Sequence, residues 1–311
     1  MIKIQKVLLY IIINTLFLSF FSCKPKQEED KTTRINRLLN NDSIRQPIEI
    51  PEISSYLKVL QQSDIKNVKS LNYAIESFLN IFARSDSSVC DSAYVHFQQF
   101  ADSIEFHQNL KLEEDTANYS IIFSGKKIPK KITEFVINLN QNGFRIQLSD
   151  SIPTVILNRK FIVEKFDSLI STQLKTYLLY LENEFKTGFA ESDSIIISPI
   201  ELVDRILWYE NFIQNYPNFV FRRECENHLK AYTTYLVLGY GKTKFFQDES
   251  KFIISAYFKQ SFEYLFNKNT NSTTANKLLE FKTAIESSSF NKLIEARKNL
   301  SIKGIIYNIK T

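Results

Sequence analysis

The sequence contains very little glycine. Six glycines among 311 residues amount to about 2%, whereas average proteins contain roughly 7%. Loops that hold phosphate groups, and sheets with many tight hairpins, need backbone conformations that glycine adopts most easily. The composition therefore argues against a nucleotide-binding enzyme and against a β-barrel.

Histidine is also scarce. The three histidines, His96, His107 and His228, form no His-x-x-x-His pair and no Cys/His cluster. A zinc site needs three or four convergent ligands. We therefore predict no metal site, and partly exposed helix positions are the simpler interpretation of His96 and His107.

Common catalytic motifs are missing as well. No Gly-x-Ser-x-Gly sequence is present to place a nucleophilic serine. Gly241-Lys242-Thr243 matches the end of a phosphate-binding loop, but Leu236 stands where that loop requires its first glycine. We predict a protein that is not an enzyme and that binds neither a cofactor nor a nucleotide.

Apolar and aromatic residues, in contrast, are plentiful. Hydrophobic residues make up 44% of the chain and charged residues 23%, with 26 phenylalanines and 15 tyrosines. This composition is typical of a globular protein with a substantial core. The length allows one large domain or two smaller ones.

The first 22 residues differ from the rest of the chain. Lys3 and Lys6 precede an apolar run that ends at Phe21, and the small residue Ser22 then comes before Cys23. A basic start, a short apolar stretch and a small residue at its end are typical of a signal peptide. The apolar stretch is too short to indicate a spanning helix.

The segment Leu18-Ser19-Phe20-Phe21-Ser22-Cys23 resembles the lipobox of bacterial lipoproteins. Phe20 and Phe21 depart from that pattern, which prefers an aliphatic residue followed by a smaller one. The resemblance implies that Cys23 is the lipid attachment site, that cleavage occurs just before it, and that an N-acyl chain completes the anchor. More than one buried chain makes such an attachment stable. An ordinary secretory signal or membrane anchor with an incidental cysteine is the alternative.

The same resemblance implies a location in the cell envelope. In Gram-negative bacteria an aspartate after the lipidated cysteine favours the inner membrane, whereas Lys24 stands there in this sequence. We therefore expect a protein of the outer membrane. The charged stretch Lys24–Asp30 is similar to tethers of surface-displayed lipoproteins, and a solvated linker is the alternative, so the periplasmic and surface faces both stay open.

The remaining chain divides by composition and periodicity. Residues 23–50 are polar and include Pro25 and Pro47, which is typical of a flexible tether. Residues 51–115 predict an N-terminal helical region, residues 116–162 a small α+β element, and residues 163–311 a C-terminal helical domain. The predicted fold is mainly α, a helical bundle or short helix-pair stack with a β-hairpin in the middle.

Apolar residues at three- and four-residue spacing predict the individual helices. We expect one helix that begins at Asp64 and one long helix from Phe166 to Gly188. Ser198-Pro199-Ile200-Glu201 forms a capping box at the start of another helix. Later helices are expected over residues 249–266, 274–286 and 291–300. The alternation from Phe144 to Leu148 predicts a strand, with residues 155–157 as its hairpin partner.

Cys90 and Cys225 are the thiols that remain after lipidation. An oxidising compartment permits a disulfide between them. Both also lie among apolar neighbours on predicted helices, where buried free cysteines are common. The two interpretations stay open.

These features predict a lipid-anchored envelope protein that acts as a non-enzymatic interaction or assembly module, with the membrane and an envelope protein as partners. The alternative is a binder of a small molecule or glycan around Trp208, Tyr209 and Phe212, although an aromatic stripe at helical spacing is usually core. An envelope hydrolase with an unrecognised site is a further alternative.

Nucleic acid is not an expected partner. Loss of Lys3 and Lys6 with the signal peptide lowers the formal charge from +5 to +3, which is too mild to indicate nucleic-acid binding. The one tight basic cluster contains Pro129, and a solvated turn is its predicted role rather than an anion or headgroup site. This cluster comprises Lys126, Lys127, Lys130 and Lys131.

Overall fold

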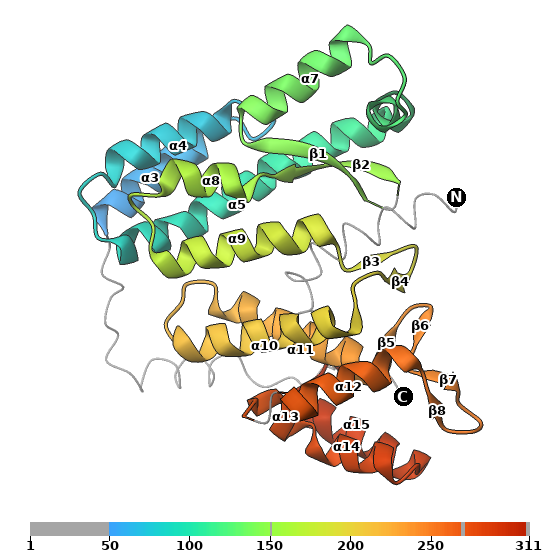
Figure 1. Ribbon diagram of the computed structural model, residues 1–311. Coiled ribbons are helices and arrows are strands. Elements are labelled where there is room, and N and C mark those ends of the chain that lie inside the picture. Colours follow the sequence, from blue (N-terminus) through green and yellow to red (C-terminus); the bar gives the residue numbers. More distant parts are fainter. Residues whose placement is uncertain (1–49, 150, 269–270, 309–311) are drawn as a thin grey trace, which may run out of the picture. The chain divides into compact units, whose positions relative to one another are not determined.

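The structure is a computed structural model that describes residues 50–149, 151–268 and 271–308. Residues from Pro51 to Thr311 form one compact unit, and this unit contains its own hydrophobic core. The predicted signal peptide, the predicted lipid attachment site Cys23 and residues 23–49 of the predicted tether lie outside the described residues. The fold is mainly α with small two-stranded antiparallel sheets, and the predicted fold class is confirmed (Figure 1).

Three helices begin the unit, namely α3 (Pro51–Gln62), α4 (Ser70–Ile81) and α5 (Ser87–Glu114). They pack through fully buried aromatic rings, in which Tyr56 meets Phe78 and Phe82 edge to face. The predicted start of α4 at Asp64 is wrong. The Asp64 carboxylate accepts a hydrogen bond from the backbone N–H of Lys66, and this local bond stabilises a turn that delays the helix.

The predicted hairpin is confirmed. After α6 (Thr116–Tyr119), the 3-10 helix η1 (Ser120–Phe123) and α7 (Lys130–Gln141), strand β1 (Phe144–Ser149) pairs antiparallel with β2 (Ile152–Leu157). Two side chains of α5 bind the free edge of β2. Asn109 exchanges two hydrogen bonds with the backbone of Val155, and Glu105 accepts one from the N–H of Leu157. Side chains that occupy an edge in this way block further strand pairing.

The predicted long helix from Phe166 begins later than expected: Phe166 is the last residue of a separate helix, α8 (Arg159–Phe166), and the long helix is α9 (Thr172–Thr187). Ser171 ends the break, because its hydroxyl accepts a hydrogen bond from the N–H of Leu174 and caps α9. Asp91 of α5 accepts hydrogen bonds from both the N–H and the hydroxyl of Ser171. The end of α9 at Gly188, with φ of 71°, is as predicted.

Two longer helices follow the short strand pair β3 (Ala190–Glu191) and β4 (Ser194–Ile195). These are α10 (Pro199–Asn215) and α11 (Arg222–Leu238). The predicted start of α10 is confirmed, since the hydroxyl of Ser198 accepts a hydrogen bond of 3.1 Å from the N–H of Glu201. Helix α10 packs against both α11 and α12 (Ala256–Lys268).

The C-terminal part contains more strands and shorter helices than predicted. Two further strand pairs precede α12, and the helix expected over residues 274–286 breaks at Leu278. Glu210 of α10 stabilises the start of the helix that begins at Thr273. Its carboxylate accepts hydrogen bonds from the backbone N–H groups of Thr273 and Thr274. The elements are β5 (Gly239–Tyr240), β6 (Thr243–Lys244), β7 (Phe246–Asp248), β8 (Ile253–Ile254), α13 (Thr273–Lys277), α14 (Leu279–Glu286) and α15 (Phe290–Ile302).

One hydrophobic core runs through the unit. Phe166 of α8 contacts Phe78 of α4 and Tyr94 of α5, so the N-terminal helices and the segment after the hairpin share this core. Cys90 and Cys225 are free and buried on α5 and α11. No disulfide joins them, and each thiol fills core volume as a small apolar side chain does.

Candidate functional site

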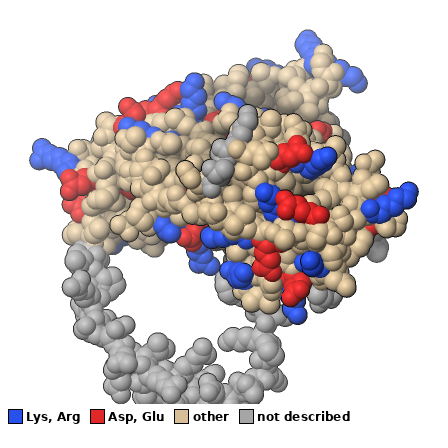
Figure 2. Space-filling model, turned by 60° about the horizontal axis from the view of Figure 1, so that its bottom comes forward, with Lys and Arg blue, Asp and Glu red and all other residues tan. Residues whose placement is uncertain are grey.

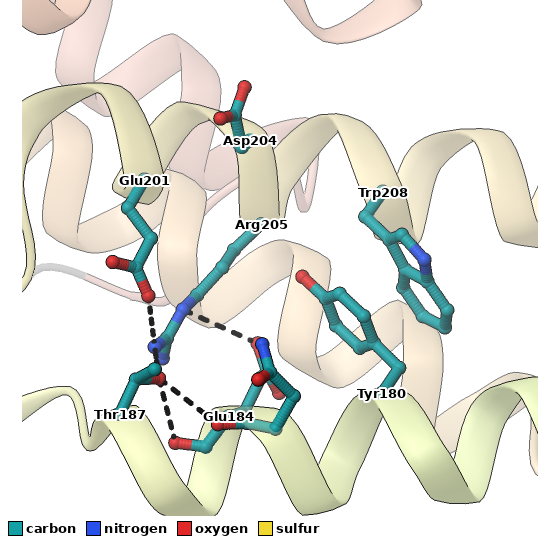
Figure 3. A pocket seen from close by; sticks show the side chains of 8 residues that line it. Tyr180, Glu184, Thr187, Glu201, Asp204, Arg205 and Trp208 are labelled. Atoms are coloured by element: carbon teal, nitrogen blue, oxygen red, sulfur yellow. Dashed lines mark hydrogen bonds and ion pairs between the residues drawn. The ribbon is translucent and has the colours of Figure 1, made fainter.

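A pocket of about 320 Å³ opens between α9 and α10. The residues that each helix contributes are spaced by three or four positions, and such residues lie on one face of a helix. Figure 3 shows the side chains of the two helices meeting across the pocket. We call it the α9–α10 pocket, and its lining residues are Tyr180, Asn183, Glu184, Thr187, Glu201, Asp204, Arg205 and Trp208.

Arg205 connects the two helices beneath the pocket and is only 3% exposed. One terminal nitrogen donates hydrogen bonds of 2.7 Å to Thr187, to the carbonyl oxygen of Gly188 and to the carboxylate of Glu201. The other donates to the hydroxyl of Tyr232 at 3.2 Å. Because these bonds use its terminal nitrogens within the protein, Arg205 organises the pocket rather than offering a free donor to a ligand.

Glu184 is the least satisfied group of the pocket. Its side chain is 8% exposed, and one carboxylate oxygen, Oε2, accepts a hydrogen bond of 2.7 Å from Tyr209. The other oxygen, Oε1, is buried and makes no close hydrogen bond among the described residues, although a hydrogen bond between the Tyr232 hydroxyl and this carboxyl group lowers the pKa of Glu184. The nearest cation is Nε of Arg205 at 3.7 Å, which is too far for a hydrogen bond. Burial has the larger effect and raises the pKa of this carboxyl group.

Aromatic rings form one wall of the pocket. The Trp208 ring stacks on Tyr180, with centroids 3.5 Å apart, and also on Phe212, with centroids 4.8 Å apart. Figure 3 shows the side of the Tyr180 ring away from Trp208 turned toward Arg205. Tyr209 and Phe212 are buried. Of the predicted aromatic group, therefore, only Trp208 reaches the pocket, while the other two belong to the core.

The charges of the pocket are unequal. Glu184, Glu201 and Asp204 supply three carboxyl groups against the single guanidinium of Arg205. Asp204 is exposed and accepts a hydrogen bond of 2.9 Å from Tyr264. The volume lies near the lower end of the range of ligand pockets, which begins at roughly 300 Å³. A small cationic group that donates hydrogen bonds matches this volume and this charge.

The three histidines do not meet. His96 and His107 lie on α5, and His228 lies on α11 stacked against Tyr209 at 4.9 Å. Burial and the nearby arginines Arg159 and Arg205 lower the pKa of His228 to about 4. Among the described residues no group of three or more His, Cys, Asp or Glu side chains is placed to hold a metal ion.

The predicted basic cluster around Pro129 lies at the surface, where all four of its lysines are exposed. Lys130 forms an ion pair of 3.7 Å with Glu134. On the face drawn in Figure 2, lysine and arginine side chains are interspersed with aspartate and glutamate. Mixed charge of this kind does not create the single-sign field that steers nucleic acids.

Sequence reasoning missed Tyr180, Glu184 and Arg205. A signal was present, because Glu184 follows Tyr180 and Leu181 at helical spacing, and Arg205 has the same spacing to Leu202, Trp208 and Tyr209. Charged residues on a buried stripe are usually paired. Which helix supplies the partner, however, depends on tertiary packing that periodicity does not specify.

Comparisons with known proteins give no relatives. No protein-family model, no curated protein and no solved structure matches the chain. Within the part of the chain that the structure describes, no helix has the length and apolar character needed to cross a membrane.

Proposed function

We propose that the protein is a lipid-anchored, non-enzymatic interaction module of the cell envelope, whose α9–α10 pocket receives a cationic side chain of a partner protein. Cys23 is the proposed lipid attachment site, and the outer membrane is the proposed location. The observation that carries the proposal is the excess of carboxyl groups in the α9–α10 pocket, where Glu184, Glu201 and Asp204 face the single guanidinium of Arg205.

A lysine or arginine side chain of a partner supplies what this pocket lacks. Its N–H groups donate to the accessible carboxylates of Glu201 and Asp204, and a hydrogen bond to a charged group contributes about 1.5–3 kcal/mol. Tyrosine, tryptophan and arginine are enriched at the residues that dominate protein interfaces.

Binding of a glycan or small molecule at Trp208 is the second candidate, because this ring lines the pocket. A sugar would need an open ring face on which to stack. The rings of Tyr180 and Phe212 already stack on Trp208, so we rank this candidate below the protein partner. A hydrolase is ranked lower still, because the pocket offers no nucleophile beside a base.

The chain carries a single tryptophan, so its fluorescence reports directly on this pocket. We expect the peptide acetyl-Gly-Arg-Gly-amide to change Trp208 emission at millimolar concentration, which corresponds to roughly −4 kcal/mol. The same peptide with neutral citrulline in place of arginine should have no effect. An equal response to both peptides, or to neither, would contradict the proposal, and a response to neutral oligosaccharides alone would favour the second candidate.

Two variants sharpen this test. Asn183→Arg places a guanidinium on the exposed rim of the pocket, where it competes with the peptide, so the fluorescence response should disappear. Asn291→Arg makes the same substitution at an exposed position of α15 and should leave the response unchanged. Loss of the response in both variants would indicate a general charge effect.

The anchor has a separate test. In cells, Cys23→Ala should give a protein that is neither lipidated nor cut before residue 23. Metabolic labelling with a fatty acid and the mobility of the protein on gels measure both properties. Unchanged labelling and processing in this variant would refute the lipoprotein assignment without affecting the proposal for the α9–α10 pocket.

A further inference from the structure

A second hollow, of about 410 Å³, lies between α4 and the end of α7. It shares no lining residue with the α9–α10 pocket. Most of its lining side chains are uncharged and polar, and four of them carry amides. We call it the α4–α7 groove; α4 contributes Asn72, Tyr73 and Glu76, and the chain around the end of α7 contributes Asn138, Gln141 and Asn142.

Hydrogen bonds fix the amides of this groove in one arrangement. The Asn72 amide donates to Oδ1 of Asn142 at 2.9 Å and to the backbone carbonyl of Gln141 at 3.1 Å. The Asn142 amide donates in turn to the backbone carbonyl and side-chain oxygen of Asn138, at 2.7 and 3.2 Å. Asn142 is only 5% exposed. A ligand would therefore meet oriented groups that need little ordering on binding.

Several groups of the groove keep free hydrogen-bonding capacity. Among the described residues, the side-chain amide of Gln141, the amide nitrogen of Asn138 and the hydroxyl of Tyr73 make no hydrogen bond. Tyr73 is 56% exposed, an unusually open position for so large a ring. An open aromatic face therefore lies beside fixed amide donors and acceptors.

The charge of the groove is balanced. Lys69 and Glu76 are its charged residues, and their formal charges cancel. A phosphate or carboxylate ligand would need an excess of positive charge, and a cationic ligand an excess of negative charge. An apolar ligand would leave the free N–H donors of the amides unpaired, which lowers its affinity. A neutral ligand with many hydroxyl groups fits this lining.

We propose that the α4–α7 groove binds a neutral carbohydrate. A sugar ring presents an apolar face of C–H groups, which packs on the open Tyr73 ring, while its hydroxyl groups donate to and accept from the amides of Gln141 and Asn138. This arrangement combines one apolar surface with a few placed polar groups, as ligand sites generally do. The inference does not rest on the function proposed for the α9–α10 pocket.

The test uses native gels that contain a soluble neutral polysaccharide, with the unit from Pro51 to Thr311 as the protein. Dextran, mannan, glycogen and xyloglucan are the four probes, and the anionic polysaccharide alginate is the fifth. We expect at least one neutral probe to retard the protein. Tyr73→Ala should weaken that binding roughly tenfold, the size of one lost aromatic contact, and Tyr73→Phe should retain it within about threefold because the ring remains.

The control is Tyr307→Ala, which removes another tyrosine that is 39% exposed and lies outside the groove. It should migrate like the unchanged protein, and thermal unfolding should show that all variants remain folded. Absence of retardation by all four neutral probes would overturn the inference. Binding that survives Tyr73→Ala would also overturn it. Equal retardation by alginate and by the neutral probes would do the same, because the positive charge of Lys69 would then be sufficient to explain the binding.

Discussion

Replacement of Glu210 by glutamine tests the packing that holds α10, and therefore one side of the α9–α10 pocket, in place. Glu210 is 4% exposed. Its carboxylate accepts hydrogen bonds from the hydroxyl of Ser272 at 2.9 Å and from the N–H groups of Thr273 and Thr274 at 2.8 and 2.7 Å. These bonds satisfy the otherwise unpaired N–H groups at the start of α13.

The expected loss follows from these three bonds. Hydrogen bonds to a charged group contribute about 1.5–3 kcal/mol each, and glutamine keeps one oxygen as an acceptor. Its NH₂ group, however, replaces the other oxygen and faces donors at hydrogen-bond distance. We therefore expect Glu210→Gln to lower the free energy of unfolding by about 2–4 kcal/mol, which corresponds to a melting temperature lower by roughly 5–10 °C for a unit of this size.

The effect should also depend on pH. Burial alone would raise the pKa of Glu210, but the hydrogen bonds from Thr274, Ser272 and Thr273 outweigh it and hold this pKa below its usual value. The stabilisation is therefore fully present above the unfolded pKa of about 4.3. It is lost as the pH falls through the lower, folded-state pKa. The difference between the two proteins should narrow in that acidic range.

Urea unfolding followed by circular dichroism measures both effects. Glu226→Gln is the matched control, because Glu226 pairs with Arg222 at 2.8 Å on the exposed surface of α11. Exposed pairs of this kind contribute about 0–1 kcal/mol, so the control should change little. A Glu210→Gln variant within about 0.5 kcal/mol of the unchanged protein, or a difference that persists unchanged at low pH, would refute the reasoning.

Three further predictions concern buried groups. Arg205→Met should destabilise the protein by about 3–5 kcal/mol, because it leaves the carboxyl group of Glu184 buried without its counter-charge; a loss below 1 kcal/mol in urea unfolding would contradict this. NMR titration of His228 should show a neutral ring at pH 6, because burial lowers its pKa to about 4. The stability that the neutral His228 ring contributes is present above the unfolded pKa of about 6.5 and declines as the pH falls toward 4. An NMR titration midpoint near 6.5 for His228 would contradict its burial. Cys90 and Cys225 should not react with Ellman's reagent while the protein is folded, because both thiols are buried and burial raises the pKa of Cys225 to about 12. Both should react once the protein unfolds, without a reductant. If the two cysteines formed a disulfide, neither would react under these conditions.

Local signals predicted local structure well. The N-cap at Ser198, the helix end at Gly188 and the alternation after Gly143 each depend on residues within a few positions of one another, and each is confirmed. Periodicity alone did not place the start of α4 or the break before α9. At both points a short polar side chain bonds to the nearby backbone: Asp64 stabilises a turn ahead of α4, and Ser171 caps the first turn of α9.

The strand pairs after Gly239 and the α9–α10 pocket escaped prediction for different reasons. Strands of two or three residues are too short to show alternation. The pocket depends on side chains from two helices, and the weak pairing of Glu184 with Arg205 follows from a 3.7 Å separation between Oε1 of Glu184 and Nε of Arg205. The sequence showed that charged residues stood on a buried stripe, but the separation depends on how the two helices pack.

The most direct test of the proposed function is photo-cross-linking in cells that carry the full-length protein. A photoreactive phenylalanine analogue at position 183, on the rim of the α9–α10 pocket, should attach to one envelope protein through a segment that contains lysine or arginine. The same analogue at position 291 should not attach to it, and adding Glu184→Gln to the probe at 183 should reduce the yield. Equal cross-linking from both positions, or attachment to a segment without a cationic side chain, would contradict the proposed function.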